Sequence, residues 1–500
     1  MADLGTTTPG GSLLVLAVLL PVVGIILSFV TGGRHADRIT LALTPFGVAL
    51  ACAIAFRVGQ SGRSVTYMIG GLPPPLGIAL QADGISAVML IAAAAILTAA
   101  AFYAREKFAV RDGARESRSA LTFWIMMQAI WAALTIIFVG SDLFNLYVAL
   151  ELLTFAAVPL VCIDGRPETL AAALRYLLFA LFGSISYLLG VALFYGAHGT
   201  LDITLLAHRV QPTPVVWTAA ALMTAGLLAK TALFPLHLWL PPAHANAPAA
   251  ASAVLSGLVV KGSFFLMLRL WFYVLPALPT GQVAAVLGAL GSAAVVVGGV
   301  LALRQRRLKL LIAYSTVSQI GYLFLIFPLA AGTQAWSAIG WSAGLMQVLA
   351  HAFAKAAMFL AAGVLAETIG HDQIEKLGGA VRVLPLTFLT LALGGLSLMG
   401  LPPSGGFFAK WLMLQASVAS GQWIWSLPIL AGGLLAAGYM YRVLKPALSD
   451  GEISVQSQPR RYQEAIAFAL TLIALALAFA PPAFFDFMEI GRPLADAGRS

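Results

Sequence analysis

The chain has 500 residues, of which 60% are hydrophobic and only 10% are charged. Because about a quarter of the residues in soluble domains are charged, this composition excludes an ordinary soluble protein. The net charge of +9 does not indicate a nucleic-acid-binding protein, since the excess Lys and Arg lie in short loops between apolar runs, where a membrane-topology signal belongs.

Apolar runs recur from one end of the chain to the other, each long enough to cross a hydrocarbon core of about 30 Å. They predict an all-α polytopic membrane protein with about fourteen transmembrane helices, whereas the strands of a membrane β-barrel would be only about 10 residues long. The first run is expected to remain as a span, because residues 1–11 hold no basic residue and lack the first region of a signal peptide. The predicted spans are 12–30, 38–57, 83–103, 119–139, 142–163, 170–196, 214–235, 249–275, 281–303, 309–331, 337–366, 383–420 (interrupted), 425–446 and 461–485.

Two segments between the spans have a distinct composition. Residues 59–82 contain a Gly-Gly pair and three consecutive prolines, which predict an external loop or hairpin. Residues 197–213 are amphipathic and are expected to lie along the surface. The two cysteines, Cys52 and Cys162, fall within apolar segments and are expected to be small buried hydrophobic residues rather than a disulfide or metal ligands.

The distribution of basic residues predicts the orientation of the chain. An even number of spans places both termini on one side, and if that side is the outside, the inward loops hold eighteen basic residues and the outward segments six. Since basic loops stay in the cytoplasm, we expect both termini to face away from it, in a cell (inner) membrane. The inward residues are Arg34, Arg38, Arg105, Lys107, Arg111, Arg115, Arg118, Arg166, Arg304, Arg306, Arg307, Lys309, Lys376, Arg382, Arg442, Lys445, Arg460 and Arg461; the outward ones are Arg57, Arg63, Arg209, Arg269, Arg492 and Arg499.

Few charges remain at membrane depth, and Glu151 is the acidic residue near the middle of a span. An unpaired carboxylate there is costly, so Glu151 is expected to be protonated or paired with a cation on another helix. The functional interpretation is a Glu–Lys pair whose strength decides how readily the lysine releases its proton. The alternative is a static pair that fixes helix packing.

Lys230 and Lys410 each lie beside an interrupted span. Lys230 precedes Pro235, and Lys410 follows a segment that contains Pro402 and Pro403. The two interruptions are about five spans apart and therefore cross in opposite directions, which is typical of inverted-repeat transporters. A broken helix exposes backbone groups that can hold water or ions, although prolines can also kink a helix for packing alone.

Further polar residues could extend this path. Lys261 lies well inside its span and is a candidate central relay lysine. His351 and Lys355 are four residues apart on one helix face, where a neutral histidine beside a lysine can pass a proton or simply hydrogen-bond in the core. His237 and His244 flank a Pro-Pro pair, where they could give a proton access to water or cap the edge of a loop.

The sequence carries no enzyme signature. Gly70-Gly71 and Gly405-Gly406 lack the strand–helix context of a nucleotide-binding loop, and no Cys/His cluster could hold zinc or an iron–sulfur centre. We therefore expect an ion-transport subunit without metal, cofactor or catalytic chemistry of its own, driven by an ion gradient or by partner subunits.

Taken together, these motifs resemble the antiporter-like proton-translocating membrane subunits of respiratory complex I, membrane-bound hydrogenases and Mrp-type multisubunit Na⁺/H⁺ antiporters. The motifs that carry the resemblance are the span of Glu151, Lys230–Pro241 with Ala243–Ala245 and Ala247–Pro248, Lys309–Tyr322, His351–Ala356 and Gly405–Lys410.

The resemblance implies two inverted five-helix repeats, with the seventh and twelfth helices broken. It divides the chain into helices 1–3 with the external loop 59–82 (residues 1–118), a first repeat of helices 4–8 (119–275), a second repeat of helices 9–13 (281–446), and helix 14 with a tail (447–500).

The resemblance also assigns roles. Glu151 matches the family's glutamate of the fifth helix, Lys230 the lysine of the broken seventh, and Lys261 the central lysine of the eighth. His351 and Lys355 match polar positions of the eleventh helix. Lys410 matches the lysine or glutamate of the twelfth, so these six residues are the expected proton-transfer groups.

Within the family, lysine at 410 resembles the Mrp D subunit and one complex I paralogue more than the complex I subunit that has glutamate there. The stretch Gly70–Ile78 with Asp83 also resembles the Mrp D subunit, and the chain ends before the long lateral helix of the largest complex I paralogue. We therefore expect a proton-translocating subunit of a multisubunit Na⁺/H⁺ antiporter, with other antiporter subunits, the lipid bilayer, protons and Na⁺ as partners and no nucleic acid. The alternatives are a proton-pumping subunit of complex I or a hydrogenase, and a non-transporting scaffold that docks partners or a quinone.

Overall fold

The computed structural model describes residues 6–32, 35–109, 117–276, 278, 281–451 and 453–493. Four residues used to predict the orientation, Arg34, Arg111, Arg115 and Arg499, lie outside these ranges.

The apolar runs form long helices because a helix satisfies all of its backbone hydrogen bonds internally, which the bilayer core requires. In the described part of the chain, thirteen helices are long and apolar enough to cross a membrane. The interrupted pair α17 (Pro385–Met399) and α18 (Gly405–Ala419) corresponds to one more crossing, so the predicted number of about fourteen agrees with the structure.

The first half of the chain contains α1 (Ser12–Val30), α2 (Ala36–Ser61), α3 (Gly84–Phe108), α4 (Arg118–Val139), α5 (Leu143–Val161), α6 (Pro167–His198), α7 (Ile203–Arg209), α8 (Pro214–Thr231), α9 (Leu240–Asn246), α10 (Ala249–Val254) and α11 (Val260–Leu268). Two π-helical segments, η2 (Leu255–Val259) and η3 (Arg269–Val274), follow α10 and α11 and continue the same span. The second half contains α12 (Gly281–Leu303), α13 (Leu308–Phe324), α14 (Ile326–Ala330), α15 (Ala335–Ile369), α16 (Ala380–Val383), α17, α18, α19 (Ser426–Leu448), α20 (Arg461–Ala476) and α21 (Pro482–Glu489).

The predicted loop 59–82 forms a hairpin, in which β1 (Val65–Met68) pairs antiparallel with β2 (Ala79–Ala82). The amide of Thr8 donates to the carbonyl of Thr66 at 2.9 Å, and the amide of Gly84 donates to the carbonyl of Ile490 at 3.0 Å. The segments near both ends of the chain therefore meet at the same end of the bundle as the hairpin.

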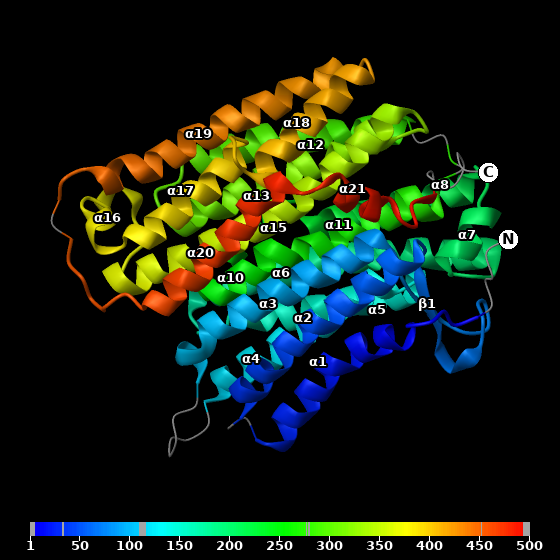
Figure 1. The fold of residues 1–500 in the computed structure, drawn as a ribbon, viewed down its shortest axis with the longest axis horizontal. Coiled ribbons are helices and arrows are strands. Elements are labelled where there is room, and N and C mark those ends of the chain that lie inside the picture. Colours follow the sequence, from blue (N-terminus) through cyan, green and yellow to red (C-terminus); the bar gives the residue numbers. More distant parts are fainter. Residues whose placement is uncertain are drawn as a thin grey trace.

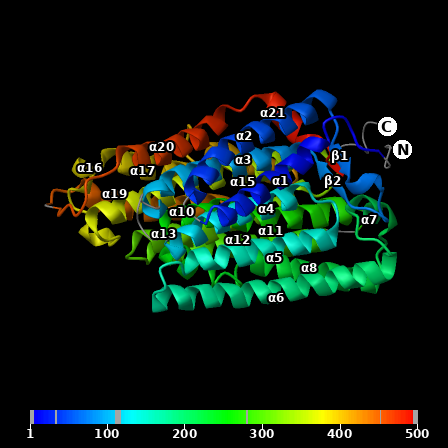
Figure 2. The same cartoon turned by 90° about the horizontal axis from the view of Figure 1, so that it is seen from below.

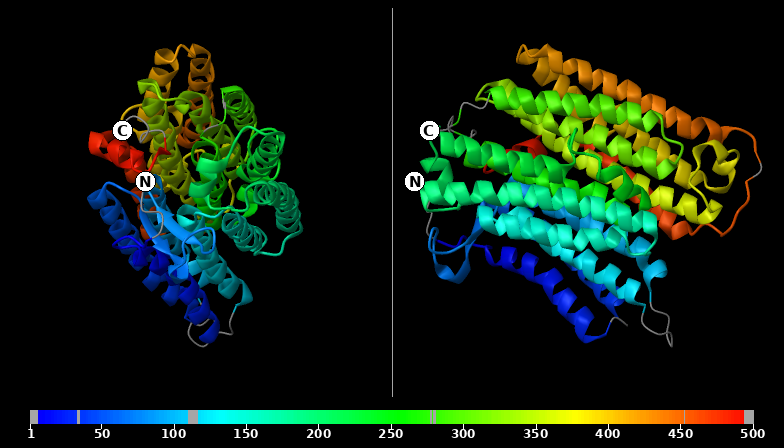
Figure 3. Two further views of the ribbon diagram at one scale, coloured as in Figure 1. Left: turned by 90° about the vertical axis from the view of Figure 1, so that its right-hand side faces the viewer. Right: turned by 180° about the vertical axis from the view of Figure 1, so that it is seen from behind.

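We call this the hairpin end; it includes the β1–β2 hairpin and α7, and lies on the right in Figure 1. We call the opposite end, with residues 162–166, 304–307, 370–383 and 453–460, the basic end. The spans run between the two ends in Figures 1 and 2 and in the right panel of Figure 3, whereas the left panel of Figure 3 looks at the hairpin end. In Figure 2, α6 lies along one outer edge of the bundle. α7 is the predicted surface segment: Ile203 and Leu206 are buried while His208 and Arg209 are exposed.

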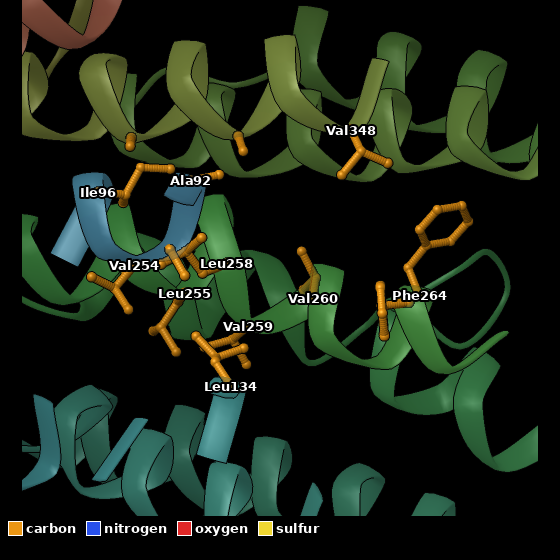
Figure 4. Packing of buried hydrophobic residues seen from close by; sticks show 14 of the residues in the cluster. Ala92, Ile96, Leu134, Val254, Leu255, Leu258, Val259, Val260, Phe264 and Val348 are labelled. Atoms are coloured by element: carbon orange, nitrogen blue, oxygen red, sulfur yellow. The ribbon is translucent and has the colours of Figure 1, made fainter. Parts of the chain in front are cut away.

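The spans differ in how much protein surrounds them. The span Ala249–Val274 and α15 are wholly buried over their most apolar windows, whereas only 22% of that window is buried in α1 and 28% in α2. We call the span Ala249–Val274 the central span. Figure 4 shows its apolar side chains packed against Ala92 and Ile96 of α3 and Leu134 of α4. The deep polar residues are concentrated on the enclosed helices, where other protein groups can satisfy them.

One expectation about the cysteines was wrong. Cys52 is exposed on α2 and Cys162 is only half-buried at the end of α5; both are free thiols. Lipid is as apolar as the core, so the hydropathy of a span does not distinguish its lipid-facing side from its buried side.

Candidate functional site

The predicted carboxylate–lysine pair is present between α5 and α8. Lys230 Nζ lies 3.2 Å from Glu151 Oε1, and it also donates to Thr154 Oγ1 at 2.9 Å and to the Leu150 carbonyl at 3.4 Å. The Ser184 hydroxyl of α6 donates to the same carboxylate. Lys230 is buried and Glu151 is mostly buried, so each charge depends on the other for compensation.

Two glycines bring the helices of this pair close together. A Cβ at Gly226 of α8 would lie 2.3 Å from the Gly183 carbonyl of α6, and a Cβ at Gly183 would lie 2.7 Å from the Gly226 carbonyl. Small residues permit such close approach between membrane helices. The contact places Ser184 and Lys230 on facing turns around Glu151.

α8 ends directly after Lys230, as the following proline predicted. Ala232 has φ 58°, the only positive value at a non-glycine among the described residues. The Trp239 indole donates at 2.9 Å to the Ala229 carbonyl, which also accepts from the Ala232 amide at 3.2 Å. The indole stacks on Tyr176 with ring centres 4.2 Å apart. These contacts hold the break although Ala232 adopts its left-handed backbone conformation at an energetic cost. Such strained residues are common at functional sites.

Lys261 lies wholly buried in the central span. Its ammonium donates to the Ser256 carbonyl, which belongs to the π-helical segment η2. The Ser256 hydroxyl lies 3.0 Å from the Thr316 hydroxyl of α13. Segments of π-helix are frequent at functional sites, and here the segment turns a carbonyl towards the lysine.

Residues close in sequence to Lys230 and Lys261 contact each other between α8 and α11. The Thr231 hydroxyl donates to Ser263 Oγ at 3.0 Å. Lys230 and Ser263 also line one cavity of about 10 Å³, which is about the space that one water molecule requires.

His351 and Lys355 lie on α15, as predicted, and both are buried. Lys355 Nζ donates to the Ser315 hydroxyl and, at 3.0 Å, to the Ile312 carbonyl of α13. Neither ring nitrogen of His351 has a hydrogen-bond partner among the described residues.

His351 lies within electrostatic range of three of the buried lysines. Lys261, Lys355, Lys410 and His244 all lie close enough to His351 for a charge on any of them to act on its ring. The structure therefore brings these five predicted residues into one electrostatic neighbourhood inside the bundle.

Lys410 lies in α18, after the second break. Its ammonium donates to the Leu398 carbonyl of α17 and lies 4.4 Å from the centre of the Tyr322 ring. Gly400 has φ +81°, and a Cβ there would lie 2.6 Å from Lys410 Cδ. Ser404 begins α18 by accepting from the Phe407 amide at 3.1 Å. The interruption of the helix therefore leaves the Leu398 carbonyl available to Lys410, and the glycine at position 400 leaves room for the lysine side chain.

Two glutamines that the sequence analysis missed connect α15 with this second break. Gln347 Nε2 donates to Gln319 Oε1 at 2.9 Å, and Gln319 Nε2 donates to the Leu398 carbonyl at 3.2 Å. Gln347 precedes His351 by four residues, on the same face of α15. That spacing, and the placement of Gln319 within the Lys309–Tyr322 motif, were available signals in the sequence.

The two histidines of the first broken helix differ. His244 is wholly buried between the rings of Trp239 and Phe359, at 6.4 and 5.7 Å, and the charges of Lys261 and Lys355 act on it. His237 is also buried, but its described ring contact is with Phe234 at 5.5 Å. His244 therefore lies within electrostatic range of two of the lysines, although neither of its ring nitrogens has a hydrogen-bond partner among the described residues. No hydrogen bond between described residues joins His237 to the lysines.

A vestibule of about 320 Å³ opens at the basic end beside the end of α9. Lys309 Nζ donates to the Ala247 carbonyl on its wall at 3.0 Å. Partial burial acts to raise the pKa of Asp164, but hydrogen bonds from Thr169 and Arg166 outweigh it and hold that pKa below its ordinary value. The rim therefore carries a carboxylate charge at neutral pH, close to the segment that leads to His244. The vestibule is lined by Lys107, Phe108, Ala109, Ser117, Ser119, Ala120, Ile163, Asp164, Arg166, Asn246, Ala247, Pro248 and Lys309.

Two arginines that were assigned to outward segments are in fact buried. Arg269 lies in η3, inside the central span, and pairs with Asp83; Arg492 pairs with Glu489. Arg269 was predicted to lie outside the membrane because it comes near the end of an apolar run. Its acidic partner Asp83 is 186 residues away in the chain.

We call Glu151, Lys230, Lys261, His351, Lys355 and Lys410 the row. In chemical terms, the row consists of one carboxylate, four buried amines and one buried imidazole, with hydroxyl and amide groups beside them. Such groups can hold and pass protons. No cluster of His, Cys, Asp or Glu suited to a metal ion occurs among the residues that the structure describes.

Residues 140–435 match the family model described as NADH:quinone oxidoreductase/Mrp antiporter, TM. One relative, the N subunit of the NADH-quinone oxidoreductase of Desulforudis audaxviator, is 33% identical over 83% of this chain and 84% of its own. The D subunit of the Na(+)/H(+) antiporter of Alkalihalophilus pseudofirmus is 28% identical over 86% of both chains. A chain in the structure of the Mrp complex from Dietzia sp. DQ12-45-1b has the same fold, with a TM-score of 0.86, 23% identity and 96% of both chains covered. The chain therefore belongs to the NADH:quinone oxidoreductase/Mrp antiporter family of membrane subunits.

Proposed function

We propose that this chain is the proton-translocating subunit of a multisubunit Na⁺/H⁺ antiporter complex, equivalent to the Mrp D subunit. The observation that carries the proposal is the row of deep ionisable groups, Glu151, Lys230, Lys261, His351, Lys355 and Lys410, set between two broken helices. Charged groups are rare inside membrane proteins and mark ion pathways there. The likeness to a chain of the Mrp complex supports the same assignment.

In the proposed mechanism, the Glu151–Lys230 pair holds a proton on Lys230. When the pair loosens, the uncompensated ammonium becomes unfavourable in its buried site, and the proton leaves. It passes by way of Thr231 and Ser263 to Lys261, and onwards through His351 and Lys355 to Lys410. His244 gives access from the vestibule, and His237 is assigned to the same access route on the basis of its sequence position alone.

The proposed domain organisation follows the resemblance. Residues 119–275 and 281–446 form two repeats of opposite orientation, each with a lysine beside its broken helix, while residues 1–118 and 447–500 flank them. The basic end is assigned to the cytoplasm of a bacterial cell membrane, so both termini face away from the cytoplasm. The excess of basic residues at that end supports this orientation.

A second candidate is the antiporter-like subunit of complex I or a related redox-driven complex. The relative named as the N subunit of an NADH-quinone oxidoreductase, at 33% identity, favours it. The buried row would carry protons in the same way, but the driving force would come from a redox module. Isolation of the native complex distinguishes the two: small antiporter subunits are expected, and flavin or iron–sulfur subunits would favour the second candidate.

The experiment that tests the function is cation-driven proton transport by the assembled complex in vesicles. Replacement of Lys230, Lys410 or Glu151 by alanine is expected to abolish transport while the complex still assembles. Arg175→Ala is the matched control, because Arg175 is exposed on α6 and outside the row. Normal antiport in the three variants would refute the path, and loss of assembly with normal flux per complex would favour the scaffold role.

A further inference from the structure

A buried ion pair lies at the hairpin end, outside the lysine row. Arg269 Nη1 is 2.6 Å from Asp83 Oδ2, and Nη2 is 2.9 Å from Asp83 Oδ1, so the pair is bidentate. Arg269 also donates to Ser86 Oγ at 2.8 Å, and Asp83 accepts from the Ser86 amide at 2.9 Å. This geometry ties the start of α3 to the end of the central span.

The pair lies on the same helix face as the central lysine. Lys261, Phe265, Arg269 and Tyr273 follow one another at intervals of four residues, so they form one stripe. The guanidinium lies 4.8 Å from the Phe265 ring and 4.2 Å from the Tyr273 ring. Eight residues separate Lys261 from Arg269, or about 12 Å along the helix.

Apolar side chains fill the interval between Lys261 and the pair. A cavity of about 10 Å³ touches Lys261, and its other lining residues are apolar, among them Ile85, Phe265, Val348 and Met488. Hydrophobic constrictions of this kind can close a pore by excluding water. The cavity meets the Lys261 stem, while the ammonium points to the Ser256 carbonyl. A route from Lys261 to the hairpin end through this cavity would be narrow and lined by apolar side chains.

The segment that contains Met488 and Arg492 borders this cavity through Met488. The Ile490 carbonyl accepts from the Gly84 amide at 3.0 Å, and the Met488 carbonyl accepts from the Trp341 indole at 3.4 Å. A Cβ at Gly491 would lie 2.6 Å from Asp83 Cβ. The segment is thus held against both α3 and α15.

Arg492 anchors the C-terminal part of residues 488–492 to α14 and α15. Its Nη2 donates to Ser337 Oγ at 2.8 Å and to the Ala330 carbonyl at 3.3 Å, and its guanidinium lies 4.8 Å from the Trp341 ring. Arg492 is 4% exposed, so its contacts span the junction between α14 and α15 rather than solvent.

We propose that the Asp83–Arg269 pair and residues 488–492 form a gate that closes the route between Lys261 and water at the hairpin end. When the gate opens, water reaches Lys261, and the ammonium gives its proton to water and becomes a neutral amine. When the gate is closed, the lysine communicates only with the row and the basic-end vestibule. Asp83, Arg269 and Arg492 act as positioning residues, because they control access and do not themselves carry the proton. The purpose of the gate rests on the proposed function. Whether the gate is closed can be measured without a transport assay.

The test is thiol accessibility in the assembled complex, in a Cys52→Ser, Cys162→Ser background. Val348→Cys places a thiol in the cavity beside Lys261, and Leu391→Cys places a control thiol at a buried position on α17. A membrane-impermeant methanethiosulfonate reagent is applied from the hairpin end in vesicles of known orientation. Both thiols are expected to be unreactive in the parent.

Arg492→Gln and Asp83→Asn are expected to make Val348→Cys react at least about tenfold faster while Leu391→Cys stays unreactive, as a population shift towards an open state requires. Rapid reaction of Val348→Cys in the parent, or no change in either gate variant, would overturn the gate and leave a static clamp. If Asp83→Asn exposes both thiols, the fold has loosened in that variant, and the Arg492→Gln result alone decides. A complex that fails to transport protons but shows this labelling pattern would contradict the proposed function and not the gate.

Discussion

The lysines beside the two broken helices lie in different surroundings. Lys230 has a carboxylate, a hydroxyl and a carbonyl as partners, whereas Lys410 has a carbonyl and an aromatic ring. Among the described residues, no ion pair joins Lys261, Lys355 or Lys410 to an acid. Both halves therefore place a lysine at a break in a helix, but within the described residues only the first half supplies that lysine with a counter-charge. We infer that the first half regulates protonation and the second half transmits it.

The largest expected effects come from replacing Lys230 or Lys410, and the two replacements should differ in their effect on protein stability. Lys230→Met and Lys410→Met should each reduce proton transport by about 10²-fold or more, the usual contribution of a proton-transfer group. Lys230→Met leaves Glu151 without its cation and should destabilise the protein by about 3–5 kcal/mol, whereas Lys410→Met removes an unpaired buried charge and should be neutral or stabilising. Thermal unfolding of the purified complexes checks this difference, and equal destabilisation by both variants would contradict the comparison.

A second prediction concerns the glutamine link in the second half. Gln319→Leu should lower transport by about tenfold, because it removes the connection between α15 and the Leu398 carbonyl, at a cost of about 1–3 kcal/mol for the partner left unsatisfied. Proton flux per assembled complex is the measurement. Gln128→Leu, in a separate buried polar network with Ser28 and Thr40, is the control and should leave flux unchanged.

The break itself can be tested at Gly400. Gly400→Ala should reduce transport several-fold, because the methyl group would clash with Lys410 Cδ and alanine rarely adopts φ +81°. Gly196→Ala is the matched control, since a Cβ there meets no atom within 4 Å. Equal transport by the two variants would show that the position of Lys410 is not critical.

The smallest effect is expected at Ser184. Ser184→Ala removes one hydrogen bond from Glu151 and should cost about 1 kcal/mol while altering transport by less than about tenfold. Because Glu151 keeps Lys230 as its partner, the pair should persist. An effect as large as that of Lys230→Met would mean that the hydroxyl, and not the lysine, controls the carboxylate.

The sequence predicted those parts of the structure that follow from the cost of burying charge and backbone. That cost explains why helices end near residues 30 and 139 and why Glu151 pairs with Lys230. It also explains the two interruptions. The shared face of His351 and Lys355 follows from helical periodicity. These features depend on nearby residues or on the need of one buried charge for another.

What the sequence did not predict depends on contacts between distant segments. Arg269 was assigned to an outward segment because its partner Asp83 lies far away in the chain. The motif singled out the region of Gln319, but the hydrogen bonds of Gln319 to Gln347 and Leu398 depend on how α13, α15 and α17 meet. The π-helical segment next to Lys261 has no composition signal in the apolar run that contains it. Cys52 was assigned to the core because a span's hydropathy does not reveal which side faces lipid.

One continuous row of groups is proposed to carry protons across both halves of the protein. Lys261 is the critical position, because it lies between the regulated pair of the first half and the unpaired lysines of the second. The most direct measurement is proton flux through the assembled complex that carries Lys261→Met. We predict a loss of about 10²-fold or more with assembly intact, and flux at the level of the unmodified complex would contradict the continuous row.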